Sequence, residues 1–139
     1  MTFWKESLLV GVPQIDDQHR KLVVSIDRLM EACMQGKGRS TIKETLIFVI
    51  TYTKEHFHDE EKLQAKYEYP ERIAHKLLHE QFIKDINVIL RDLQQAGPNV
   101  SLTGRVNKTL VDWLINHIST EDKKLGEYIN RADVRALAE

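Results

Sequence analysis

The stretch from Ile42 to Leu63 reads IKETLIFVITYTKEHFHDEEKL, and its apolar residues recur every three or four positions. That period is typical of an amphipathic helix with one face toward a core. The positions on this face are Ile42, Leu46, Val49, Thr53, His56, Glu60 and Leu63. His56 and Glu60 therefore stand where leucine is expected, on adjacent turns of the same face. The stretch predicts a long helix that carries two polar groups into the interior.

Three further amphipathic stretches flank this one, and glycine and proline separate them all. One runs from about Asp16 to Gln35 and ends at Gly36, a residue suited to the left-handed conformation after a helix. The central stretch begins near Ser40, where Thr41 and Glu44 have capping-box spacing. A third opens at Pro70 and ends at Gly97, with an inner face of His75, Leu78, His79, Phe82, Ile86, Ile89 and Leu93. The fourth begins near Ser101.

The short connections between these stretches favour antiparallel neighbours. We therefore predict an all-α fold, an up-down-up-down antiparallel four-helix bundle. The 139 residues are enough for one core, so we expect a single domain over residues 1–139. Residues 1–15 contain Phe3, Trp4, Leu8, Leu9 and Val10 and are expected to form an N-terminal arm against the bundle.

Composition excludes several function classes. The 20 basic and 21 acidic residues give a net charge of −1, which does not favour nucleic acid or an anionic membrane surface. The longest apolar run, Leu46–Ile50, is far short of the ~20 residues that cross a bilayer, so no membrane insertion is expected. The N-terminus lacks the pattern of a secretory signal, and Cys33 is the single cysteine. We expect a cytoplasmic protein in which Cys33 is a buried, inert thiol.

Polar residues occupy inner positions on all four helices. His19, His75, His79 and His117 join His56 and Glu60, and either Glu121 or Asp122 follows His117. A single His-x-x-x-His pair is usually a surface feature, as His58 is expected to be. Burial of such polar groups from four helices costs free energy unless a cation binds to them. Imidazole and carboxylate suit iron, zinc and copper, whereas calcium and magnesium prefer oxygen alone. Lys76 stands where a zinc protease needs glutamate, so that class is disfavoured.

Four segments together resemble the hemerythrin family in its single-domain bacterial form, bacteriohemerythrin. They are Trp4 with VGVPQIDDQHRKL from Val10 to Leu22, HFHDE from His56, HKLLH from His75 and HISTED from His117. The resemblance implies a non-haem centre of two iron ions (Fe²⁺/Fe³⁺) bridged by oxide or hydroxide. It implies that one iron takes His75, His79 and His117, that the other takes His19 and His56, and that Glu60 and Asp122 bridge both. One coordination position then stays open, on the iron with two histidines.

The resemblance also implies a dioxygen pocket, with apolar walls formed by Leu22, Phe57, Trp113, Leu114 and Ile118. One implied ligand conflicts with regular helix geometry. In an α-helix Glu121 lies over His117, whereas Asp122 is rotated away by roughly 140°. We therefore predict a π-bulge or 3₁₀ distortion between His117 and Asp122.

The function that the resemblance implies is reversible dioxygen binding for storage, transport or delivery, without enzymatic activity. The partners would be dioxygen and an oxygen-consuming enzyme as its recipient, and we expect a monomer. The alternatives are a di-iron oxidase or peroxidase, a nitric-oxide-handling enzyme, an oxygen or redox sensor module, and a zinc site with a non-redox role. An enzyme would require a polar acid or base near the open position, and the sequence offers none that can be assigned.

Overall fold

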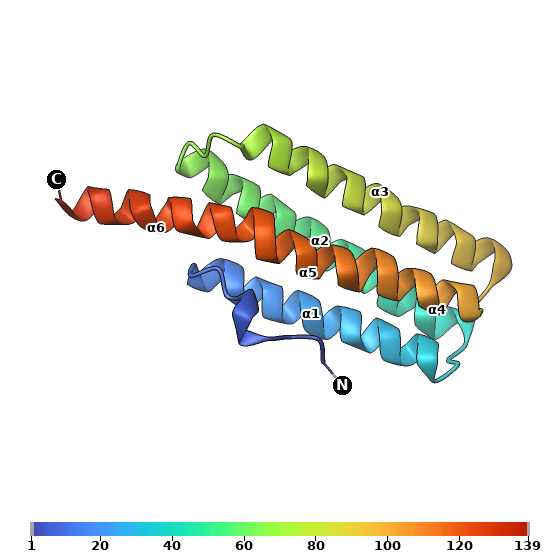
Figure 1. Ribbon diagram of the computed structural model, residues 1–139. Helices are drawn as coiled ribbons and strands as arrows, with labels where there is room; N and C mark the ends of the chain where they lie inside the picture. Colours follow the sequence, from blue (N-terminus) through green and yellow to red (C-terminus); the bar gives the residue numbers. More distant parts are fainter. Residues whose placement is uncertain (1, 139) are drawn as a thin grey trace.

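The computed structural model describes residues 2–138; Met1 and Glu139, the ends of the expected domain, lie outside the described residues. Three long helices, α1 (Pro13–Met34), α2 (Arg39–Lys66) and α3 (Arg72–Ala96), precede a fourth helical run. That run is α4 (Val100–Val106), η2 (Asn107–Asp112), α5 (Trp113–His117), η3 (Ile118–Asp122) and α6 (Lys123–Ala138). We call α1, α2, α3 and this fourth run the four rods of the bundle. They lie side by side and alternate in direction (Figure 1), which confirms the all-α, up-down-up-down antiparallel four-helix bundle.

The apolar stripes of the four rods meet along the bundle axis. Leu22, Ile26, Leu46, Phe82 and Leu110 are among the side chains with almost no exposed surface. Burial of such side chains supplies the main driving force for packing the helices together. Leu78 was expected on the inner face of α3 but is 39% exposed. In this part of α3 the buried positions are His75, His79 and Phe82, and Leu78 lies to one side of the line that they form. Cys33 was expected to be buried but is only partly buried against the core, and this burial raises the pKa of its thiol.

The helix ends agree in part with the sequence. Gly36 follows α1 with φ +67°, and the N–H of Lys37 donates to the carbonyl of Ala32 at 3.0 Å, as expected for a glycine-terminated helix. In contrast, α2 begins at Arg39 without a side-chain cap, so the capping-box spacing after Ser40 is not used. Helix α3 starts at Arg72, two residues after Pro70. The Oδ1 atom of Asn99 caps α4 by accepting the Leu102 N–H at 2.8 Å.

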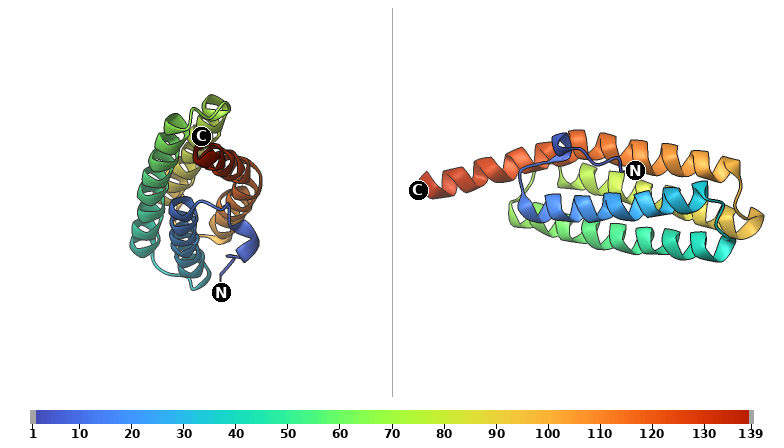
Figure 2. Two further views of the ribbon diagram at one scale, coloured as in Figure 1. Left: turned by 90° about the vertical axis from the view of Figure 1, so that its left-hand side faces the viewer. Right: turned by 90° about the horizontal axis from the view of Figure 1, so that it is seen from below.

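The N-terminal arm lies against the fourth rod, where its short 3₁₀ turn η1 (Glu6–Leu8) contacts η3. Leu8 and Val10 are buried, and the Asp16 carboxylate accepts the N–H groups of Val10 at 2.7 Å and Gly11 at 3.2 Å. A Cβ atom at Gly126 would lie 2.1 Å from the Val10 carbonyl oxygen, so the arm approaches α6 through a gap that only glycine leaves open. Figure 2 shows this crossing from two sides.

The last turns of α6 project beyond the other three rods, as both side views show (Figures 1 and 2). Val134 and Leu137 on this projection are exposed. No helix within residues 2–138 has the length and apolar character needed to span a membrane.

Candidate metal centre

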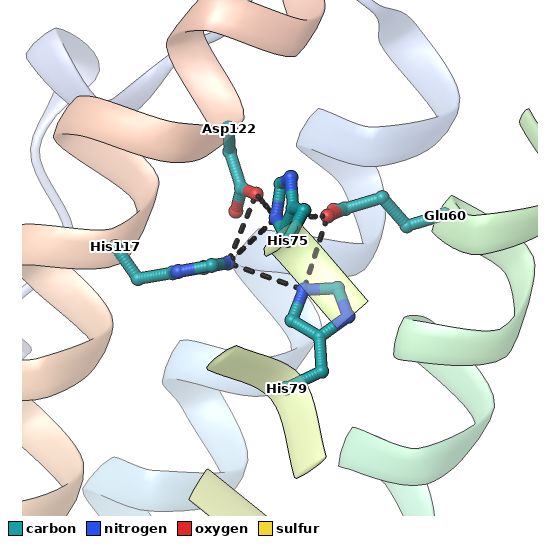
Figure 3. Close-up of side chains that lie close together, drawn as sticks. All are labelled: Glu60, His75, His79, His117 and Asp122. Carbon is teal, nitrogen blue, oxygen red and sulfur yellow. Dashed lines mark hydrogen bonds and ion pairs between the residues drawn. The ribbon is translucent and has the colours of Figure 1, made fainter. Parts of the chain in front are cut away.

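Seven side chains from all four rods converge at one level of the bundle. None of them is more than 4% exposed. They come from α1 (His19), α2 (His56, Glu60), α3 (His75, His79), α5 (His117) and η3 (Asp122). Their donor atoms form two groups, each with all atoms within 4.8 Å of one another. The first group is Glu60, His75, His79, His117 and Asp122, drawn in Figure 3, and the second is His19, His56, Glu60 and Asp122.

Glu60 belongs to both groups because its two oxygens face different histidines. Oε1 lies 3.1 Å from Nε2 of His75 and 3.3 Å from Nε2 of His79. Oε2 lies 3.2 Å from Nε2 of His56 and 3.7 Å from Nε2 of His19. The i, i+4 spacing of His56 and Glu60 on α2 places both groups on the inner face, as the sequence indicated.

The two carboxylate oxygens of Asp122 also face different histidines. Its Oδ1 atom lies 3.0 Å from Nε2 of His75 and 3.2 Å from Nε2 of His117, whereas Oδ2 lies 3.0 Å from Nε2 of His19. Two carboxylates thus join a set of three histidines, His75, His79 and His117, to a set of two, His19 and His56. We call these the three-histidine set and the two-histidine set.

The backbone between His117 and Asp122 explains how Asp122 reaches the cluster. Residues Ile118–Asp122 form the π-helical segment η3, which closes its hydrogen bonds from residue i to i+5. Side chains five residues apart then share a face, so Asp122 points inward with His117. The predicted distortion is confirmed, and Asp122 rather than Glu121 belongs to both donor groups.

The donor atoms lack the partners that buried polar groups normally have. Nε2 of His117 lies 2.9 Å from Nε2 of His75 and 3.2 Å from Nε2 of His79. Five of the six buried side-chain atoms without a hydrogen-bond partner in residues 2–138 belong to this cluster: Nδ1 and Nε2 of His19, both carboxylate oxygens of Glu60, and Oδ1 of Asp122. Converging nitrogen lone pairs and unbonded carboxylate oxygens fit a cation at the middle of each group.

The electrostatics of the cluster also favour positive charge. Burial lowers the pKa of His19 and His75, but the close carboxylates of Asp122 and Glu60 outweigh burial and raise these values to about 9 and about 10. Burial by itself would raise the pKa values of Glu60 and Asp122, yet the histidine nitrogens that face these carboxylates hold both values well below their usual range. The two acids are therefore ionised and provide two negative charges inside an apolar bundle.

Three side chains that the sequence did not single out contact the outer nitrogens of the histidines. Oε1 of Gln18 accepts from Nδ1 of His56 at 2.8 Å, Oε2 of Glu61 lies 3.0 Å from Nδ1 of His79, and the amide of Gln64 lies 3.1 Å from Nδ1 of His75. At His56 and His79 an oxygen atom accepts from Nδ1, which fixes the ring orientation and leaves Nε2 free to face a metal. At His75 the amide nitrogen of Gln64 faces Nδ1, so this contact orients the ring but does not by itself free Nε2. Gln64 is four residues after Glu60, and that spacing was the one signal that could have indicated it.

The expected pocket residues are buried or partly buried, and two of them, Phe57 and Trp113, stack on histidines of the cluster. Leu22, Phe57, Leu114 and Ile118 are buried, and Trp113 is partly buried. Phe57 stacks on the ring of His79, with centroids 3.7 Å apart, so it covers the three-histidine set. Outside Phe57 a surface groove of about 370 Å³ runs between α2 and α3, and it includes His58, which is exposed as expected.

Comparison with known proteins gives the family of this site. The model of the hemerythrin HHE cation binding domain matches residues 10–129. The chain belongs to the hemerythrin family. It is 33% identical over 126 residues to a bacteriohemerythrin of Stenotrophomonas maltophilia, covering 91% of this chain and 80% of the relative. It is 36% identical over 119 residues to a bacteriohemerythrin of Pseudomonas aeruginosa, covering 86% and 75%.

A crystal structure of a hemerythrin mutant superimposes on the chain with a TM-score of 0.80 and 26% sequence identity, covering 92% of this chain and 98% of the other. The family match spans all seven residues of the cluster. Hemerythrin membership implies non-haem iron, and the nitrogen and oxygen donors of the cluster are suitable ligands for it.

Proposed function

We propose that the chain binds dioxygen reversibly at a di-iron centre formed by the seven buried side chains. The observation that carries this proposal is the division of Glu60 and Asp122 between two sets of histidines. A single ion would need only one set. Two carboxylates that each direct one oxygen to either set are suited to hold two ions side by side.

The donor sets assign the residues to the two ions. The three-histidine set, His75, His79 and His117, would hold one iron, and the two-histidine set, His19 and His56, would hold the other. Glu60 and Asp122 would bridge them. A pair of ferrous ions supplies the two electrons that reversible dioxygen binding requires. Because the second iron has fewer protein ligands, it would offer the open position on which binding depends.

The residues that surround the cluster would keep water away from that position. We assign Leu22, Leu114 and Ile118, each at most 1% exposed, to the walls of the pocket together with Phe57 and Trp113. None of the five walls can donate or accept a proton at the reacting position, since the indole N–H is not acidic. This apolar character supports a carrier or store over an oxidase, a peroxidase or a nitric-oxide-handling enzyme, each of which uses a positioned acid or base.

The relatives named bacteriohemerythrin support the same function. The decisive experiment is to load the protein with iron, reduce it without air and admit dioxygen. A carrier gives a visible absorption band that appears with dioxygen and disappears under vacuum over repeated cycles. Irreversible oxidation at the first exposure, or turnover of an added reductant, would favour an enzyme. A protein that holds zinc but no iron would exclude the proposal.

A further inference from the structure

The outer nitrogens of the histidines do not have equivalent partners. His56 and His75 contact the neutral amides of Gln18 and Gln64. His79 contacts a carboxylate, with Oε2 of Glu61 at 3.0 Å from Nδ1. Among the hydrogen bonds to these rings in residues 2–138, this is the one with an acidic partner on the outer nitrogen. The three-histidine set therefore has an anionic partner that the two-histidine set lacks.

Glu61 lies between solvent and a buried ring. Its side chain is 27% exposed, whereas that of His79 is 2% exposed. Glu61 lines the groove between α2 and α3, where Lys54, Lys76 and Lys84 also lie. A carboxylate at this place keeps contact with water on one side and reaches a buried ring on the other, so it avoids most of the cost of burying a charge.

A carboxylate that accepts the Nδ1–H of a metal-bound imidazole has two effects. It selects the tautomer that leaves Nε2 free for the metal, and it makes the ring a stronger electron donor. A stronger donor stabilises ferric iron more than ferrous iron. A neutral amide in the same place fixes the ring but donates less charge. The contact between Glu61 and His79 should therefore lower the reduction potential on the three-histidine side.

We propose that Glu61 is a positioning residue that orients His79 and lowers the reduction potential of the iron in the three-histidine set. This inference rests on the proposed di-iron centre and adds an asymmetry between its two ions. Glu61 would stabilise the oxidised state of the iron that has no open position, while the two-histidine iron keeps only a neutral amide partner.

The test compares two substitutions that each remove one carboxylate from the same groove. Glu61→Gln keeps a hydrogen-bond acceptor at His79 but removes the charge, and Glu80→Gln removes an exposed charge from the groove lining. The iron-loaded proteins are titrated with redox mediators and followed by absorbance. We expect Glu61→Gln to shift the ferric-to-ferrous ratio at fixed potential about tenfold toward ferrous, which equals about 59 mV for a one-electron couple. Glu80→Gln should leave the ratio almost unchanged.

The outcomes separate this inference from the proposed function. Equal shifts in both variants would show a general field effect and overturn the role of the hydrogen bond, and no shift in either would overturn the tuning. Loss of iron from Glu61→Gln would show that Glu61 has only a structural role, and this result would also overturn the proposed tuning of the reduction potential. Failure of the unmodified protein to bind two irons would instead contradict the function. A second readout is the Nδ1–H proton of His79 in the zinc-loaded protein, which should be protected from exchange and lose that protection in Glu61→Ala.

Discussion

The indole ring of Trp113 lies parallel to the imidazole of His117, with ring centroids 4.4 Å apart and planes inclined by 12°. Trp113 also stacks on Phe82 at 3.9 Å. A proposed metal ligand thus forms part of an aromatic stack that leads from the cluster to a partly exposed tryptophan. This contact gives a direct optical probe of the site.

Binding of iron should quench the fluorescence of Trp113, because a redox-active ion on the stacked imidazole accepts the excitation energy or an electron. Trp4, in the N-terminal arm, is the other tryptophan of the chain. The expected result is strong quenching in the unmodified protein and weak quenching in Trp113→Phe, measured during anaerobic titration with ferrous iron. Equal quenching in both proteins would place the metal away from His117.

Asp122 and Glu121 are adjacent acids, and only Asp122 faces both sets of histidines. Asp122→Asn should reduce the bound iron below two ions per chain and lower the melting temperature of the loaded protein, because the bridge loses charge and one of its oxygens. Glu121→Gln should bind iron like the unmodified protein. Elemental analysis and thermal denaturation of the two variants decide the point. A loss of iron in Glu121→Gln would contradict the role of η3.

Gly126 and Gly104 are both helical glycines, but only Gly126 faces another backbone. A methyl group at Gly126 would meet the Val10 carbonyl at 2.1 Å, whereas nothing lies within 4 Å at Gly104. Gly126→Ala should displace the arm and cost about 1–3 kcal/mol in the free energy of unfolding. Gly104→Ala should instead stabilise the protein by roughly 0.5–1 kcal/mol through helix propensity. Urea denaturation measures both, and destabilisation of similar size in the two variants would argue against the close contact.

Metal uptake should release protons. With their pKa raised to about 9 and about 10, His19 and His75 are protonated near neutral pH in protein from which metal has been removed. A metal ion binds only the neutral ring, so uptake displaces these protons and the affinity falls as pH falls. Titration of the metal-free protein with ferrous iron in a weak buffer containing a pH indicator should show acidification. An unchanged pH would contradict the protonated state.

The same pKa values give the pH dependence of the metal-free fold. A histidine whose folded pKa exceeds its unfolded value of 6.5 stabilises the fold below that value, and this contribution is lost as pH rises through about 9 to 10. The urea midpoint of metal-free protein should therefore fall between about pH 7 and about pH 10. The iron-loaded protein should lose less over this range, since its rings have already given up the Nε2 proton.

The sequence predicted the bundle and the inward direction of its histidines because both depend on a regular helical period. His56 and Glu60 follow Ile42, Leu46 and Val49 on one stripe, and all five are buried. The family resemblance assigned the ligand role to Asp122, and the conflict of that role with a regular helix predicted a π or 3₁₀ distortion, which is observed as η3. The second π-helical segment, η2, was not predicted, because nothing in the sequence Asn107–Asp112 distinguishes it from an α-helix.

Two partners of the outer nitrogens, Gln18 and Glu61, could not be predicted, because they depend on how the helices are rotated against one another. Gln18 reaches His56 across the interface of α1 and α2, and Glu61 reaches His79 across that of α2 and α3. Both residues lie next to an inward-facing residue and appear solvent-facing on a helical projection. The prediction that Leu78 lies on the inner face was wrong for a related reason. Periodicity indicates the centre of the buried face of a helix but not how wide that face is.

Glu60 and Asp122 have a mechanical consequence for the centre. In each, the two oxygens directed at different histidine sets belong to one planar group whose internal span is fixed by covalent bonds. The distance between two ions held in this way would depend mainly on the fixed distance between the two oxygens of each carboxylate. It would depend less on the positions of the four rods. Small, slow movements of the helices would then change the orientation of the bridged pair of ions but not the distance between them.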